Sequence, residues 1–493
     1  MSEIKEKLAS CSDILQAANL EPKENFEIVN YGSIDTIEPT NYEGRMLSAL
    51  AFLLSNSKDS INKVSAQELM DKIDNVICSQ VQEVLQDDTF RKLEESWRSV
   101  YELASSIDNN KTKLAILDVD KEELAEDFEM NAADILSSDL FQKTYVHEYD
   151  QYGGEPFGSI IGLYEFDKTQ EDIEWLMTMG KIAEASHAPF IAAISPNFFG
   201  GKDYSSLSEI KDIDSMMAHP RFGRWNAFRK TKSAGYIGLT LPNFMLRAPY
   251  HPDTNPVGKG VISNFKESVD ISKPYESCLW GNAAVLFAKN LYRSFTVTGW
   301  CQSICGPTSG GLVEGLPIYN YNSHDANAYV LPTNYLIPDH KEYGLAKAGF
   351  IPLVYEKKTA NACFFSAQSL KLAEEFENDN DSENSQMVTK LPYTFSMSKI
   401  AHYVKCMTRD VIGSEADETV VSNAITSWLN QYVTTAPNPN SLTKSYYPFK
   451  NVGVGVEKNR GMAGHYKCHI EILPHIKFEG MDVTMKIDTR LDS

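Results

Sequence analysis

Three short, predominantly apolar runs in the middle of the chain constrain its fold more than any other feature. They are Ile160–Tyr164, Phe190–Ile194 and Ile237–Leu241. Between the first two, apolar residues recur at helical spacing after a predicted cap at Thr169. Runs of this kind, without an alternating polar face, indicate strands that are buried on both faces, and their alternation with helices is typical of a parallel or mixed sheet. The sequence therefore predicts a mixed α/β fold with a central domain at residues 111–350.

The first 110 residues are predicted to form a separate helical region. Leu69–Leu85 and Phe90–Ala104 carry apolar residues at helical spacing, so both are interpreted as ordinary core-facing helices. A shorter amphipathic stripe precedes them, before a polar stretch around Pro22 that contains few packing residues. This stripe consists of Ile4, Leu8, Cys11 and Leu15.

The last part, residues 351–493, changes from helices to strands. The acidic stretch Glu374–Glu383 is predicted to be a solvent-facing loop. Helices are expected over Met397–Val411 and Val421–Tyr432, and after them the apolar period switches to two, which predicts half-buried strands. The apolar positions are Val452, Val454 and Val456, then Tyr466, Cys468, Ile470 and Ile472, then Met481, Val483, Met485 and Ile487.

Strands near a chain end expose backbone donors and acceptors unless another strand pairs with them. In a protein that assembles, such strands can be exchanged between subunits as connectors. The alternative is a closed meander within one chain, and the pattern alone leaves both open.

The charge of the chain limits its partners. The 493 residues contain 46 Lys and Arg against 67 Asp and Glu, a formal charge of -21, which argues against nucleic acid as the main partner. The eight cysteines are scattered and no secretion signal is visible, so reduced thiols are expected. No apolar run approaches the roughly twenty residues that cross a bilayer. A cytoplasmic protein without membrane insertion is predicted.

The familiar catalytic patterns are missing from the sequence. The glycine-rich turn at residues 306–311 lacks the Lys-Ser/Thr of a phosphate-binding loop, because Leu312 and Val313 follow it. Neither Gly-x-Ser-x-Gly nor His-Glu-x-x-His occurs. In a strand, His465 and His469 share one face while Cys468 points to the other, so these residues and the nearby His475 do not converge on a metal. No catalytic residue, cofactor site or metal site is predicted.

Many short blocks, in one order along most of the chain, resemble the large sheath subunit of type VI secretion systems, the TssC or VipB family. The blocks are Phe90–Arg98, Pro156–Gly162, His187–Ala193, Tyr236–Pro242, Leu279–Ala284, Gly349–Leu353, Phe364–Leu370, Leu391–Tyr393, Ala401–Tyr403, Leu473–His475 and Phe478–Gly480. No single block is decisive, but together they are a specific signal.

The resemblance implies a mechanical role without an active site. Such proteins pair with a small sheath subunit (TssB/VipA-like), here expected to contact residues 1–110. The heterodimers form six-fold rings stacked helically around an inner tube (Hcp-like) on a baseplate, and contraction propels the tube. The connector strands would be 452–456, 466–472 and 481–487. In the family, a Clp-type unfoldase recognises a helix near the N-terminus. In this chain that helix would correspond to Ile4, Leu8 and Leu15.

Two departures from the family pattern limit what is carried over. The glycine turn contains Pro307, Thr308 and Ser309 where the family is richer in glycine and charge, and Asn243 stands where a basic residue is common. Contacts with the inner tube and the choice of unfoldase are therefore not carried over. The alternatives are a single-chain sheath of the phage-tail type and a cytoplasmic α/β enzyme with a dispersed site.

Overall fold

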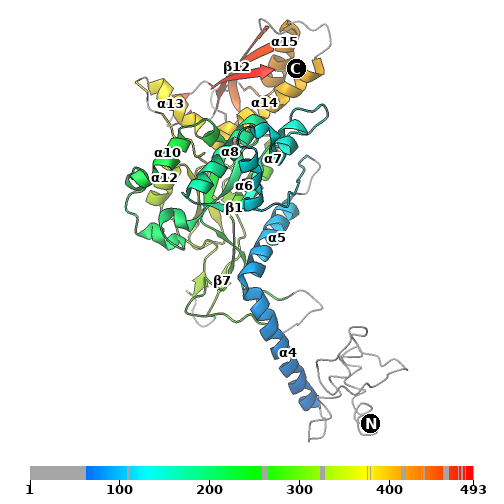
Figure 1. The fold of residues 1–493 in the computed structure, drawn as a ribbon, viewed down its shortest axis with the longest axis vertical. Coiled ribbons are helices and arrows are strands. Elements are labelled where there is room, and N and C mark those ends of the chain that lie inside the picture. The colour runs from blue at the N-terminus through cyan, green and yellow to red at the C-terminus, as the bar shows by residue number, and fades with distance from the viewer. Residues whose placement is uncertain are drawn as a thin grey trace, which may run out of the picture. The chain divides into compact units, whose positions relative to one another are not determined.

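The computed structural model divides into two compact units (Figure 1). It describes residues 63–107, 111–257, 265–322, 328–374, 376–377, 379–411, 418–434, 436, 439–458, 466–475, 477–478, 481–482 and 485–491. One unit comprises residues 1–90 and 250–268, and includes helix α4 (Lys63–Gln86). The other comprises residues 91–249 and 269–493 and contains most of helix α5 (Asp88–Ser106). The predicted helices at 69–85 and 90–104 are confirmed.

A six-stranded mixed sheet forms the centre of the larger unit. Its order is β1 (Ile160–Phe166), β2 (Phe190–Ile194), β3 (Ile237–Leu241), β9 (Phe350–Tyr355), β10 (Ala362–Phe364) and β6 (Leu312–Val313). The first four strands are parallel, and the last two join antiparallel. The predicted α/β class and mixed sheet are confirmed. The sheet extends to Phe364, beyond the expected end of the central domain at residue 350, because the antiparallel hairpin of β9 and β10 continues it.

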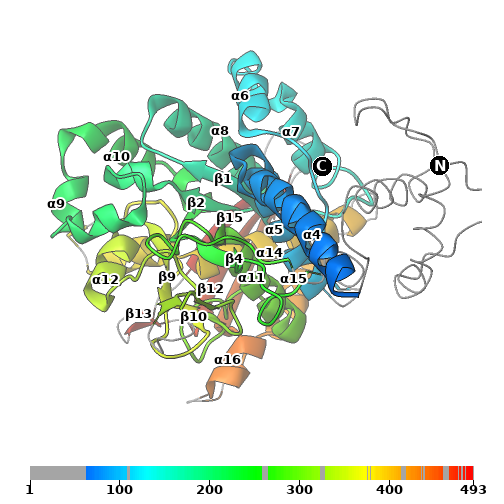
Figure 2. The ribbon, with the colours of Figure 1, turned by 90° about the horizontal axis from the view of Figure 1, so that it is seen from below.

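Alternate residues of each central strand enter two separate cores. Phe190, Ala192 and Ile194 of β2 face a core with helices α8 (Gln170–Ser186), α10 (Gly223–Arg229) and α12 (Asp339–Lys347). The intervening Ile191 faces a second core with α11 (Ala284–Thr298) and the start of α14 (Leu391–Val411). Figure 2 shows α8 and α10 on one side of β1 and β2, with α11 on the other. Burial on both faces explains the continuous apolar runs.

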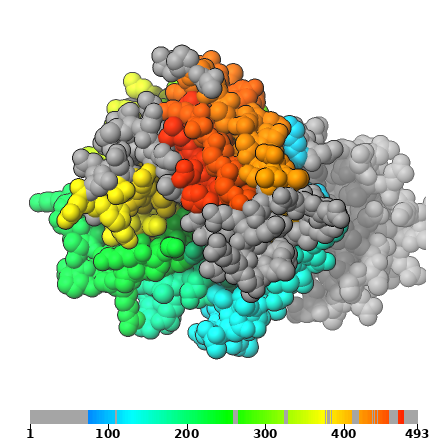
Figure 3. Space-filling view, turned by 90° about the horizontal axis from the view of Figure 1, so that it is seen from above, coloured from blue at the N-terminus to red at the C-terminus, as the bar shows by residue number. Residues whose placement is uncertain are grey.

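Helix α14 connects this sheet to a C-terminal layer. Its first turns enter the second core through Leu391 and Phe395, whereas Ile400 and Val404 enter a third core. The other elements of the third core are α15 (Glu418–Asn430), β11 (Phe449–Lys458) and β12 (Tyr466–Pro474). Figure 3 shows the orange and red C-terminal segments side by side on one face.

The C-terminal strands form a three-stranded antiparallel sheet in the order β11, β12, β15 (Met485–Leu491). The register places Val454 opposite Ile470, and Ile470 opposite Ile487. Cys468, Ile470 and Ile472 are completely buried beneath α14 and α15. The period of two predicted from the sequence is confirmed by this pairing of apolar positions.

Shorter elements complete the larger unit. They are α6 (Lys121–Met130), η2 (Ile135–Ser137), α7 (Asp139–Phe141), η3 (Gln142–Val146), η4 (Pro196–Phe199), η5 (Tyr204–Ser208), α9 (Ile213–Met217), η6 (Pro220–Phe222), η7 (Ser233–Tyr236), β4 (Phe244–Arg247), β5 (Leu279–Gly281), β7 (Tyr319–Asn320), β8 (Tyr329–Val330), α13 (Asp379–Val388), α16 (Ser441–Tyr446), β13 (Lys477–Phe478) and β14 (Met481–Asp482).

Two local predictions are wrong. The acidic stretch 374–383 is not a loop throughout, because α13 begins at Asp379. The Ser382 hydroxyl accepts a hydrogen bond from the Phe376 amide at 2.8 Å, which ties the helix to the preceding backbone. The strand expected over residues 481–487 is two strands. Met481 pairs with Phe478 in a hairpin, whereas Met485 pairs with Ile472 of β12, so the pairing partner changes between them.

Candidate assembly surfaces

The glycine-rich turn at residues 306–311 packs its backbone closely against strand β10 and against itself. The Gly306 amide donates to the Phe364 carbonyl at 2.8 Å, and the Gly311 amide donates to the Gly306 carbonyl at 2.9 Å. Gly310 has φ 102°, and a Cβ there would collide with the Ser303 carbonyl oxygen. These amides are already used within the turn and against β10, so they are not directed at a bound phosphate.

The described residues also lack the side-chain groups of a metal centre. Among them, no cluster of three or more His, Cys, Asp or Glu residues could hold a metal ion. Cys468 is buried, while His469 on the opposite face contacts Glu471 at 3.4 Å. His465 lies outside the described residues. A search of the same part of the chain finds no helix with the length and hydropathy of a membrane span.

The structure places the predicted connector residues in and around the C-terminal sheet. Val452, Val454 and Val456 are half-buried against the third core, and Ile470 and Ile472 lie inside it. Tyr466, Met481, Met485 and Ile487 lie on strands of this region. Val483, Ile4, Leu8 and Leu15 lie outside the described residues.

Among the described residues, the pairing of these strands leaves two sheet edges, except at the start of β11, where Tyr432 and Thr434 hydrogen-bond to the Phe449 backbone. Strand β12 pairs on both sides within the chain, whereas β11 and β15 are the outer strands of the sheet. On β11, Gly453 and Gly455 are exposed on the face opposite the core. A Cβ would lie 3.9 Å from the Glu471 Cβ at Gly453 and 3.8 Å from the His469 carbonyl oxygen at Gly455, which are ordinary contacts. Packing within the chain therefore does not require glycine at either position.

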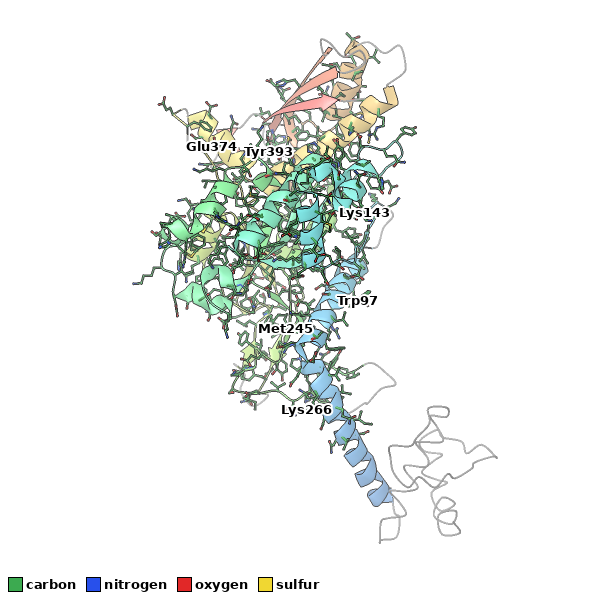
Figure 4. All side chains as sticks on the ribbon, viewed as in Figure 1. Trp97, Lys143, Met245, Lys266, Glu374 and Tyr393 are labelled. Atoms are coloured by element: carbon green, nitrogen blue, oxygen red, sulfur yellow. The ribbon has the colours of Figure 1, made fainter. Side chains whose placement is uncertain are left out.

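Helix α5 exposes an apolar stripe that the sequence had assigned to the core. Leu93, Trp97 and Tyr101, each four residues apart, are 55%, 66% and 72% exposed. Figure 4 labels Trp97 on this helix. The core-facing prediction for Leu93 and Trp97 is therefore wrong. Periodicity identifies an apolar stripe but does not say whether the chain itself covers it.

Polar contacts on another side of α5 hold the helix to the larger unit. The Arg247 guanidinium, on β4, donates to Glu94 at 2.8 Å and 3.2 Å, and both side chains are buried. Arg98 adds a contact to Glu94 at 2.6 Å. Burial alone would raise the pKa of Glu94, but the Arg247 and Arg98 guanidiniums hold it below its ordinary value. At the next position, burial and then the Glu165 charge raise the pKa of Glu95 to about 7.

Two histidines, the buried His402 and the half-buried His187, lie where α14 meets the C-terminal end of α8. His402 contacts the Ser186 carbonyl through Nε2 at 2.9 Å, and His187 contacts the Tyr236 hydroxyl through Nδ1 at 3.2 Å. Their rings are 6.2 Å apart, and Tyr149 packs against both. Burial lowers the pKa of His187 to about 3, and burial also lowers the pKa of His402. The neighbours of His402 come from segments distant in the sequence, so no local sequence pattern identifies them.

Comparisons with known proteins agree along most of the chain. Residues 67–371 match the EvpB/VC_A0108 tail sheath N-terminal domain, and residues 380–491 match the tail sheath gpW/gp25-like domain of the same family. The type VI secretion system sheath protein TssC1 of Pseudomonas aeruginosa is 34% identical over 443 residues, which cover 89% of this chain and 87% of that protein.

One solved structure shows a much weaker similarity. A chain in the cryo-EM structure of the six-fold symmetrised baseplate of the anti-feeding prophage aligns with 78% of this chain and 80% of its own length. The identity is 10% and the TM-score is 0.33, so this similarity supports no conclusion about fold or function.

Proposed function

Because this chain belongs to the EvpB/VC_A0108 tail sheath family of type VI secretion systems, we propose that it pairs with a small sheath subunit to build a contractile sheath. The heterodimers form six-fold rings, stacked helically around an inner tube on a baseplate in the bacterial cytoplasm. Contraction propels the tube without catalysis by this chain. The work comes from two alternative packings of the same subunits, of which the contracted one is more stable.

The apolar stripe of α5 is the observation that carries this proposal. Leu93, Trp97 and Tyr101 remain exposed although α5 is fixed on another side by the buried Glu94–Arg247 pair. A contiguous exposed stripe on a fixed helix favours docking of a partner in the helix-in-groove manner. The stripe lies within residues 1–110, the region expected to contact the small sheath subunit.

The outer strands of the C-terminal sheet supply the proposed links between subunits. Strands β11 and β15 each present one edge, to which a neighbouring subunit can add a strand through main-chain hydrogen bonds. The local meander and the exchange are compatible, since β12 is paired within the chain and only the outer edges are needed. Such links allow subunits to rotate and slide during contraction while they remain connected.

Co-expression with the small sheath subunit, followed by negative-stain electron microscopy, tests the proposal. Long hollow tubes are expected for the natural chain. Trp97→Glu should abolish both tubes and co-purification of the small subunit. Tyr152→Glu should leave both intact, because Tyr152 is also an exposed aromatic residue, at 79%, but lies outside α5. Deletion of residues 481–491 should preserve the heterodimer but remove the tubes.

The alternative functions predict different outcomes. Tubes formed by this chain without the small subunit would indicate a single-chain sheath of the phage-tail type. Discrete particles under every condition would contradict both sheath proposals and favour an enzyme with a dispersed site. The Clp-type unfoldase contact at Ile4, Leu8 and Leu15 stays a separate prediction.

A further inference from the structure

Residues between α5 and α6 combine exposed apolar side chains with unpaired backbone. Leu114, Ile116 and Leu117 are 40%, 63% and 51% exposed. The segment forms no helix or strand, and within the described part of the chain no backbone group from Leu114 to Asp118 makes a hydrogen bond. An apolar run bounded by charged residues normally predicts a buried strand. Residues 114–117 have such a sequence, but among the described residues no strand pairs with them.

Both ends of this segment are attached to the larger unit. At one end the Lys113 ammonium contacts Glu155 at 2.5 Å, and at the other the Tyr164 hydroxyl, on β1, donates to the Val119 carbonyl at 2.6 Å. Asp120, which follows, has the extended backbone angles φ -81° and ψ 159°. The Tyr164 hydrogen bond therefore fixes the Val119 end, the exposed Lys113–Glu155 contact adds little at the other end, and the middle of the segment remains available. An unpaired apolar edge of this kind is a template for strand addition.

Negative charge surrounds the Val119 end. Asp118, Asp120, Glu122 and Glu123 lie close enough to Tyr164 that, after burial, their charges raise the pKa of its hydroxyl to about 12. The lysine between them is already used, because Lys121 pairs with Asp172 at 2.7 Å. Among the described residues, Asp118 and Glu122 form no ion pair. A partner that approaches this end therefore encounters carboxylates whose negative charge no ion pair neutralises.

We propose that Lys113–Val119 is a docking strand for an extended, apolar segment of a different protein that carries Lys or Arg at its end. Charge complementarity selects this occupant. A second copy of the chain is a poorer occupant, because parallel pairing would place like charges together and antiparallel pairing would offer the acidic end only the Lys113 of this segment, which is already paired with Glu155. The inference rests on the proposed function, because the partner expected to supply this segment is the small sheath subunit. It adds a binding segment separate from α5 and from the C-terminal sheet.

Hydrogen exchange of the full chain, alone and in the sheath with the small subunit, tests this inference. Alternate amides within residues 114–118, those directed toward the added strand, should exchange at least tenfold more slowly in the sheath, since strand pairing occupies them. Ile116→Asp should reverse the protection and weaken co-purification, whereas Leu136→Asp, at a site 55% exposed, should not. Tubes without protection at residues 114–118 would overturn the docking strand and leave the proposed function intact. Protection in the chain alone that increases with its concentration would identify a second copy as occupant and also overturn it.

A second arm does not depend on sheath formation. A synthetic peptide of alternating Val and Thr with two Lys at each end is added to the full chain, and a peptide with Glu in place of Lys is the control. Protection of residues 114–118 by the Lys peptide, weakened by added salt, supports the docking strand even if no tubes form. Equal effects of the two peptides, or none, would contradict it.

Discussion

At the scale of single residues, His187 and His402 make stability depend on pH. The pKa of His187 is about 3 in the folded chain against an ordinary 6.5, because burial disfavours the charged ring. Tyr149, Tyr236, His402 and Lys405 surround it, and none supplies a negative charge. The unfolded chain therefore binds the proton more readily, so the stabilising contribution is present above pH 6.5 and is lost as the pH falls toward 3. Between pH 7 and pH 5 the loss from His187 is about 2 kcal/mol.

His187→Asn tests this dependence. Asparagine tolerates the left-handed conformation that His187 adopts at φ 50°, and it does not titrate. We expect the melting temperature of the variant to fall less between pH 7 and pH 5 than that of the natural chain. His340→Asn, at an exposed position, is the matched control and should leave the pH dependence unchanged. An identical pH dependence in all three proteins would exclude His187 as its source.

At the scale of elements, the Glu94–Arg247 ion pair is one of the contacts that attach α5, beside the Arg91 bonds to the Glu276 and Cys278 carbonyls. Glu94→Gln keeps the shape of the side chain but leaves Arg247, which is 5% exposed, without its carboxylate. Removing one partner of a buried pair costs about 3 kcal/mol. We expect thermal unfolding at a lower temperature and earlier proteolysis of α5. Glu276→Gln removes an exposed partner of Lys273 and should leave the unfolding temperature nearly unchanged. Equal effects would show that the Glu94 pair is not what holds α5.

Substitution of the exposed glycines of β11 distinguishes an effect on the stability of the chain from an effect on its assembly. Gly453→Ala with Gly455→Ala should raise the free energy of unfolding by about 1 kcal/mol, because space for both methyl groups exists and glycine weakens a strand. If a neighbouring subunit covers this face closely, the same variant should form fewer sheath tubes. Gly158→Ala, where a Cβ would meet nothing within 4 Å, is the control for assembly. Lower stability of the double variant would mean that strand β11 itself needs these glycines.

The local sequence pattern predicts the positions of helices and strands well, but it predicts poorly which residues pack against them. The strands β2 and β3, and the cap of α8, where Thr169 accepts from the Asp172 amide, follow from residues adjacent in sequence. The same pattern placed Leu93 and Trp97 in a core, because periodicity does not distinguish a face covered by the chain from one left exposed. The Glu94–Arg247 pair joins residues 153 positions apart, and no local signal specifies it. The apolar run at Leu114–Leu117 was visible in the sequence, but its missing partner became evident only from the structure.

At the scale of the whole molecule, α14 determines whether the C-terminal layer is an independent body. The first family match ends at residue 371 and the second begins at residue 380, beside the acidic stretch. This boundary suggests two separate domains. The cores do not divide at that point. Leu391 and Phe395 lie in the core of the central sheet, and Ile400 and Val404 of the same helix lie in the C-terminal core. In Figure 4, Glu374 marks the acidic stretch and Tyr393 the start of α14.

A cut in the acidic stretch should therefore leave the two fragments together. A glutamate-specific protease is expected to cleave first at the exposed Glu374 or Glu377, and the two fragments should then co-elute in size exclusion. Burial of Leu391 and Phe395, which are 0% and 4% exposed, holds the C-terminal fragment to the sheet. Phe395→Ala costs about 3 to 5 kcal/mol of this packing and should allow the cleaved fragments to separate. Separation of the fragments of the natural chain would show that the C-terminal layer is not held to the sheet by this packing, whereas co-elution would show that α14 keeps the two layers together without an intact connection in the chain.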